Sequence, residues 1–162
     1  MRNFFVVLFL ILLTGNESTC QTNEILRSEL GQYLGVRSGV LVAKNPVKNR
    51  WVLTAGYEGR FSTHFSIPIE LLIFRLEDGG PVLHELSTAL KFRVPLFGNL
   101  TNLYVQGGLS NGMNRGLVLH YAGGVELRLL DSILLVAQAK DFVTVDLGSF
   151  VTLGVAINLS SN

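Results

Sequence analysis

Charged and polar side chains recur at alternate positions of this sequence, in runs where the residues between them are mostly apolar. Successive side chains of a β-strand point to opposite sides, so this spacing places the polar groups on one face of a set of strands. If the strands close into a barrel, that face can line the interior. The residues expected there as a polar network are Arg37, Glu58, Arg60, Glu70, Lys91, Arg93, His120, Glu126, Arg128 and Lys140.

Two kinds of chemistry suit such a set. Its six cations and three carboxylates would give an open pore some preference for anions. Alternatively, they would fill the interior as a plug of ion pairs and hydrogen bonds, because the bore of an eight-stranded barrel is only wide enough for side chains. Buried charges need partners, and cations and carboxylates occur on different segments here, so we favour the plug.

His120 is the strongest candidate for acid–base chemistry in this set. A catalytic role requires a nucleophile and an orienting carboxylate within hydrogen-bond reach, and Ser110 and Glu126 are the available residues. No spacing in the sequence demands this arrangement, so we interpret His120 as an interior histidine. His64 and His84 fall in connections expected at opposite ends, which argues against a shared metal site. We predict no enzyme activity, no catalytic or metal-binding residues and no cofactor.

The elements that position these residues are eight segments of period two, separated by turn residues such as Lys44-Asn45-Pro46 and Asp78-Gly79-Gly80-Pro81. Their lengths suit tilted strands that cross a membrane, which need about 9–11 residues. We therefore predict an all-β fold, an eight-stranded antiparallel up-and-down transmembrane β-barrel. The predicted strands are Gln32–Ala43, Trp51–Phe61, Phe65–Leu76, Leu86–Phe97, Leu103–Ser110, Leu117–Leu129, Ser132–Lys140 and Phe150–Leu159.

Period two alone does not distinguish a membrane barrel from a soluble, lipocalin-like binding barrel, whose apolar face points inward. Charged residues make up 15% of the chain, against about 25% in soluble domains, and the mean hydropathy is +0.40. The polar face is also rich in glycine and alanine, as a cramped barrel interior requires. Trp51, Phe61, Phe65 and Phe92 fall near strand ends on the apolar face, as interfacial aromatic residues do. These features favour the membrane orientation.

The first twenty residues have the pattern of a cleaved signal peptide. Arg2 precedes the apolar run Phe4–Leu13, which is too short to span a bilayer. Ser18 and Cys20 are small residues suited to cleavage before Gln21, and lipidation of Cys20 is the alternative. The predicted organisation is a signal peptide at 1–20, a polar lead-in at 21–31 and an outer-membrane barrel at 32–162. The net charge of +1 gives no reason to expect nucleic acid as a partner.

An even number of strands places both termini at the same end of the barrel, facing the periplasm. The longer predicted connections, at about 44–50, 77–85, 111–116 and 141–149, then face outward. The turns at 62–64, 98–102 and 130–131 are mostly shorter, which is the usual asymmetry of such barrels. Outer loops of this modest length would form the contact surface, notably Glu77–Glu85 and Asp141–Ser149.

Three stretches carry a resemblance to a known group. They are Phe65-Ser66-Ile67-Pro68-Ile69-Glu70-Leu71-Leu72, Tyr121-Ala122-Gly123-Gly124-Val125-Glu126-Leu127-Arg128, and Leu153-Gly154-Val155-Ala156-Ile157-Asn158-Leu159. In these the chain resembles small outer-membrane β-barrel proteins of the Bacteroidota. From Gly123 onward it is also similar to the TraO proteins of conjugative transposons. The first resemblance implies a porin-like outer-membrane barrel in contact with lipid, and the second implies a component of a conjugative transfer apparatus with other envelope proteins as partners.

Overall fold

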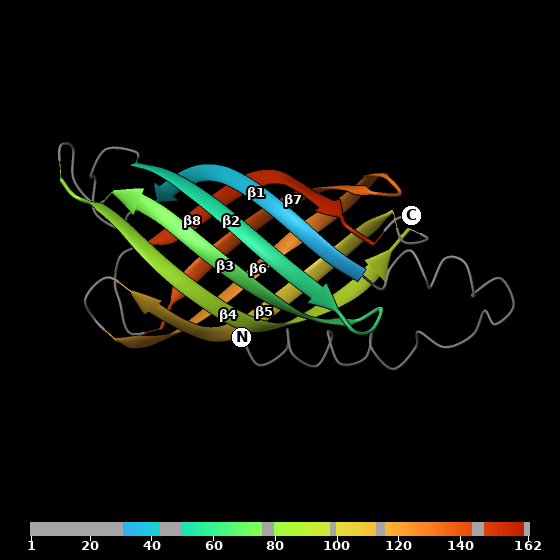
Figure 1. Cartoon of the computed structure of the whole chain (residues 1–162), viewed down its shortest axis with the longest axis horizontal. Helices are drawn as coiled ribbons and strands as arrows, with labels where there is room; N and C mark the ends of the chain where they lie inside the picture. Colours follow the sequence, from blue (N-terminus) through green and yellow to red (C-terminus); the bar gives the residue numbers. More distant parts are fainter. Residues whose placement is uncertain are drawn as a thin grey trace, which may run out of the picture.

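The computed structural model describes residues 31–42, 50–75, 80–97, 100–112, 116–143 and 148–160, which form one closed β-barrel. Each strand runs antiparallel to its neighbours, and β1 pairs with β8 to close the sheet. Figure 1 shows the strands crossing the barrel at a common tilt. The predicted eight-stranded up-and-down barrel is therefore confirmed. The strands are β1 (Gly31–Val42), β2 (Arg50–Arg60), β3 (Phe65–Arg75), β4 (Val82–Leu96), β5 (Thr101–Gly112), β6 (Leu117–Leu130), β7 (Ile133–Phe142) and β8 (Ser149–Asn158).

The two ends of the barrel differ in what they connect. β1 begins and β8 ends at the terminus end, where turns join β2 to β3, β4 to β5 and β6 to β7. The other four connections lie at the opposite, loop end. His64 lies in the turn between β2 and β3, and His84 lies near the start of β4, so the two histidines are at opposite ends as predicted.

Some strands extend further toward the loop end than the sequence predicted. β4 begins at Val82, so the last part of the predicted loop Glu77–Glu85 is strand. β7 continues to Phe142, which shortens the predicted loop Asp141–Ser149. The reason is pairing: Glu85 lies opposite Gly112, so the ladder between β4 and β5 continues past the predicted end at Ser110. Residues 43–49, 76–79, 113–115 and 144–147 of the predicted loops lie outside the described residues.

Gly31 already belongs to β1, so the predicted lead-in ends one residue too late. The rest of that lead-in, the predicted signal peptide and Cys20 lie outside the described residues. In the part of the chain that is described, no helix is long and apolar enough to cross a membrane.

The outer face of the barrel is apolar along most of each strand. In β8, for example, Val151, Leu153, Val155 and Ile157 are each 43–55% exposed, whereas Thr152 between them is 4% exposed. The same alternation runs through all eight strands, so the polar face points inward and the apolar face outward. This is the orientation that the sequence predicted, and it places large apolar side chains on the outside, as in barrels whose outer face contacts lipid.

Small residues let long interior side chains fit. Gly154 lies opposite Arg37, and a Cβ added to Gly154 would stand 2.1 Å from the carbonyl oxygen of Val36 and 2.9 Å from Cγ of Arg37. Gly124 lies opposite Tyr104, and its added Cβ would come within 2.6 Å of that phenol ring. Each glycine therefore makes room for the long side chain on the neighbouring strand.

Candidate functional site: the barrel interior

The barrel interior holds the predicted polar network, and all ten of its residues lie on the inward face. Seven of them are buried, since Arg60, Glu70, Lys91, Arg93, His120, Glu126 and Lys140 are 1–8% exposed, and Arg37 is partly buried with a side chain that is 11% exposed. Glu58 has a side chain that is 14% exposed. Arg128 is partly buried beside a β-bulge near the terminus end and lies opposite the inward-facing Leu134.

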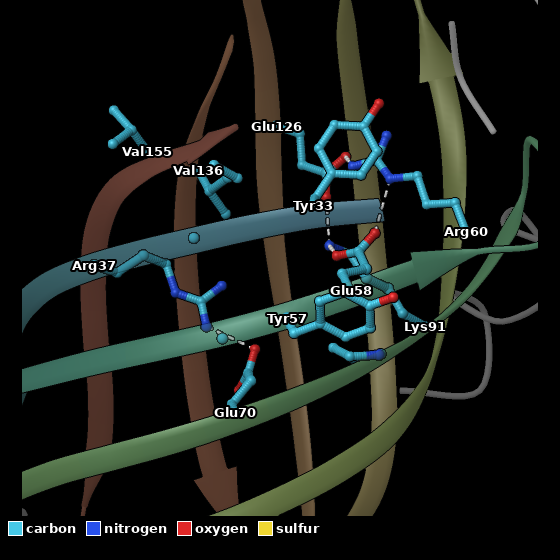
Figure 2. Close-up of a pocket in the computed structure, with 14 residues that line it drawn as sticks. Tyr33, Arg37, Tyr57, Glu58, Arg60, Glu70, Lys91, Glu126, Val136 and Val155 are labelled. Carbon is cyan, nitrogen blue, oxygen red and sulfur yellow. Dashed lines mark hydrogen bonds and ion pairs between the residues drawn. The ribbon is translucent and has the colours of Figure 1, made fainter. Parts of the chain in front are cut away.

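A cluster of five charges, Glu58, Arg60, Lys91, Arg93 and Glu126, occupies the half of the bore nearer the terminus end. The carboxylate of Glu58 accepts hydrogen bonds from Lys91 at 2.7 Å, from Arg60 at 2.9 Å and from Arg93 at 2.5 Å. Glu126 accepts from Arg60 at 2.9 Å and also from Lys91. Figure 2 shows the side chains of Glu58, Arg60, Lys91 and Glu126 converging from different sides of the barrel. These five charges form one network that joins β2, β4 and β6 across the bore.

Two tyrosines cover two of the three cations of this cluster. The guanidinium of Arg60 lies 3.9 Å from the ring centroid of Tyr33, and the ammonium of Lys91 lies 4.0 Å from that of Tyr104. An aromatic face stabilises a cation that has been removed from water. Tyr33 and Tyr104 also pack with Leu134 and Val136, the inward residues of the apolar start of β7.

A second group of charges, the Glu70 group, lies nearer the middle of the barrel and comprises Arg37, Glu70, Glu85 and Lys140. Arg37 donates to Glu70 at 2.6 Å, and Lys140 stands between two carboxylates, 3.6 Å from Glu70 and 3.5 Å from Glu85. Lys140 also donates to Ser87 at 2.7 Å. Glu85 is 0% exposed, although the sequence placed it in an exposed loop. It is a fourth interior carboxylate, which corrects the interior charge from six against three to six against four.

His120 hydrogen-bonds through Nδ1 to Ser110, with 2.8 Å between the two atoms, so this part of the hypothetical catalytic set is brought together. Glu126 is not. It lies six residues from His120 on the same strand, about 20 Å away at roughly 3.3 Å per residue, and it pairs with Arg60 and Lys91 instead. Ser110 and His120 are 2% and 3% exposed, and the ring of Phe142 lies against the histidine. Ser110 and His120 are therefore packed in the interior as a hydrogen-bonded pair.

An apolar plug that the sequence did not predict fills the loop half of the bore on the side of β1–β3 and β6–β8, while buried Glu85, Ser87 and Ser110 line this half on β4 and β5. It consists of Leu41, Val52, Leu72, Phe74, Val118, Phe142 and Phe150, all buried and in contact as one cluster. Leu72 and Phe74 fall on the inward face of β3, and the strand period indicates which way they point but not which residues they contact. The sequence did contain a signal for the plug, because each of its members lies within a few residues of the point where its strand reaches the loop end.

One small cavity lies beside the charged groups, lined by Arg37, Glu58, Glu70, Lys91 and Glu126 among others (Figure 2). Its volume is about 30 Å³. A single water molecule needs roughly 10–15 Å³ by this measure, so the cavity has room for about two or three waters. Within the described residues, no group of three or more His, Cys, Asp or Glu side chains is arranged to hold a metal ion.

Comparison with solved structures identifies barrels of the same fold. A de novo designed transmembrane β-barrel superposes with a TM-score of 0.64 and 12% identity, over 80% of this chain and 95% of the design. Neisserial surface protein A matches with a TM-score of 0.58 and 10% identity, over 80% and 97% of the two chains. Ail, the attachment invasion locus protein of Yersinia pestis and an outer membrane protein, matches with a TM-score of 0.56 and 11% identity, over 80% and 98%.

At these sequence identities, the matches show a shared fold and do not assign a family or a function. No protein-family model matches the sequence, and no curated protein matches it. The resemblance to Bacteroidota barrels and to TraO proteins therefore remains a prediction.

Proposed function

We propose that this chain is a non-enzymatic outer-membrane β-barrel with a filled bore, and that it serves a structural or partner-binding role through its loop end. The observation that carries the proposal is the distribution of side chains. Large apolar residues cover the outside of a closed barrel, while ion pairs and an apolar plug fill the inside. The likeness to designed transmembrane barrels and to Ail of Yersinia pestis supports the same reading.

The alternative of a soluble lipocalin-like binder fits this distribution poorly. Such a barrel needs a polar outer surface and an apolar interior large enough for a ligand. Here residues such as Leu119, Leu153 and Leu90 are 53–55% exposed on the outside. The cavity inside has room for water only.

Membrane fractionation with heat-modifiable gel migration tests the proposal. We expect the protein in the outer-membrane fraction, with a folded form that migrates differently from the boiled form. Recovery as a soluble periplasmic protein would overturn it. In planar bilayers we expect the purified protein to give no steady conductance, because its interior is filled; a large, steady conductance would exclude the filled bore.

The partner-binding part is tested by site-directed crosslinking in intact cells. Val143, at the loop end, is 60% exposed, and Leu130, at the terminus end, is 61% exposed, which makes them a matched pair. We expect Val143→Cys to give crosslinked products with another envelope protein and Leu130→Cys to give none. Crosslinks from Leu130→Cys alone would move the contact surface to the other end of the barrel.

A further inference from the structure

The interior is divided along the barrel axis into two sections of different chemistry. The charged section contains the cluster of five charges and the Glu70 group. The apolar plug lies at the loop end, where β1, β3 and β7 end and β2, β6 and β8 begin, and its seven members are 0–6% exposed. Glu85 and Lys140 of the Glu70 group border the plug: Glu85 lies opposite Leu72, and Lys140 lies opposite Phe150 with its ammonium 5.6 Å from the ring centroid of Phe142.

Aromatic packing closes the centre of the plug. The rings of Phe74 and Phe150 meet edge to face with centroids 5.0 Å apart, and those of Phe142 and Phe150 meet at 90° with centroids 5.6 Å apart. Phe142 and Phe150 lie on the neighbouring strands β7 and β8, whereas Phe74 on β3 reaches Phe150 from a strand that does not pair with β8, so that contact crosses the bore. An apolar constriction of this kind excludes ions because it does not hold water.

The charged section is less tightly closed. Its side chains of Glu58 and Arg37 keep 14% and 11% of their surface accessible, and the water-sized cavity lies among them. Carboxylates and guanidinium groups bind water well, and they can transiently bind an ion that passes through the bore. Ion pairs alone therefore make a weaker barrier than the plug does.

We infer that the apolar plug, and not the ion-pair network, is the seal that keeps the bore closed to ions. The charged section, which has room for only a few waters, would favour anions once the seal is broken, since its two groups hold five cations and four carboxylates. The inference rests on the proposed function, in which the unaltered barrel spans a bilayer and does not conduct.

The test compares three double variants in planar bilayers, each first checked for folding by heat-modifiable migration. Phe74→Ala with Phe150→Ala opens the plug, and we expect discrete conductance at least tenfold above that of the unaltered protein, with a reversal potential on the anion-selective side. Phe65→Ala with Phe92→Ala removes the same side-chain volume from the outer face and should stay closed. Arg37→Gln with Glu70→Gln removes one buried ion pair as a unit and should also stay closed.

A folded plug variant that does not conduct would overturn the inference, as would an Arg37→Gln with Glu70→Gln variant that conducts as strongly. If the alanine variant does not fold, Leu41→Asn with Leu72→Asn takes its place, because it makes the plug polar while keeping the number and branching of the side-chain heavy atoms. The same two outcomes apply. Conductance by the unaltered protein is measured first, and it would contradict the proposed function rather than the location of the seal.

Discussion

At the residue scale, Glu126 is the interior group whose partners are most completely defined. Its side chain is 1% exposed, and it accepts hydrogen bonds from Arg60 and Lys91. Both cations also reach Glu58, so the two carboxylates share them. Removing one carboxylate therefore leaves three buried cations against a single one.

We predict that Glu126→Gln destabilises the folded barrel by about 3–5 kcal/mol, the usual cost of breaking a buried ion pair by removing one partner. Urea unfolding in lipid vesicles measures this. Glu126→Gln combined with Lys91→Gln restores the balance and should recover part of the loss. Equal stability of Glu126→Gln and the unaltered protein would mean that the cluster contributes nothing to the fold.

The ten polar residues could be assigned to the interior from sequence because the strand period fixes which way a side chain points. Their partners could not be assigned, since pairing depends on register and on height along the barrel. Glu126 and His120 share the inward face of β6 but lie at different heights, whereas Ser110 on the neighbouring strand β5 hydrogen-bonds to His120. Glu85 was misplaced for a related reason: turn residues nearby suggested a longer loop than the β4–β5 ladder allows.

At the element scale, β6 carries adjacent glycines that serve different purposes. Gly124 points inward, and a Cβ there would lie 2.2 Å from the carbonyl oxygen of Ala137. Gly123 points outward, and a Cβ there would lie 3.6 Å from the carbonyl oxygen of Tyr104, its nearest neighbour. The two glycines make a matched pair in one strand.

We predict that Gly124→Ala lowers the free energy of unfolding by about 1–3 kcal/mol, as overpacking of a filled interior does. Gly123→Ala should be neutral or should stabilise the strand by roughly 0.5–1 kcal/mol, because glycine is unfavourable in a strand interior. Urea titration of both variants in the same vesicles measures the difference. Similar effects at the two positions would show that the close approach at Gly124 relaxes without cost.

Strand number and direction followed from the period-two segments, but strand ends were less well predicted. Turn residues mark where a strand can end, and cross-strand pairing decides where it does end. The plug was missed for a different reason. The strand period predicts that Leu72, Phe74 and the inward residues at the start of β7 point into the barrel. It does not show that they pack against apolar residues from other strands, which depends on register.

At the scale of the whole molecule, the apolar outer face decides whether the barrel enters a bilayer. Leu153 lies near the middle of β8 and is 55% exposed. We predict that Leu153→Asp impairs insertion, because a charged side chain on the lipid face near the midplane costs on the order of 2–4 kcal/mol for Arg or Lys and somewhat less for Asp. Heat-modifiable migration after refolding into vesicles measures the inserted fraction.

Leu159→Asp serves as the control, since Leu159 is 54% exposed but lies beyond the end of β8 at the terminus end. The cost of a charge falls to about 0–1 kcal/mol near the membrane interface, so this variant should insert normally. Unchanged insertion of Leu153→Asp would mean that the outer face does not contact lipid.

β8, like β5, contains no charged residue, and its inward side chains are Phe150, Thr152, Gly154, Ala156 and Asn158. The ion pairs instead join strands β1 to β4, β6 and β7 to one another. Both charged groups can therefore assemble while the sheet is still open at the β1–β8 seam. β8 therefore carries no ion of its own into the interior, so closure of the ring requires no desolvation of a charge on that strand.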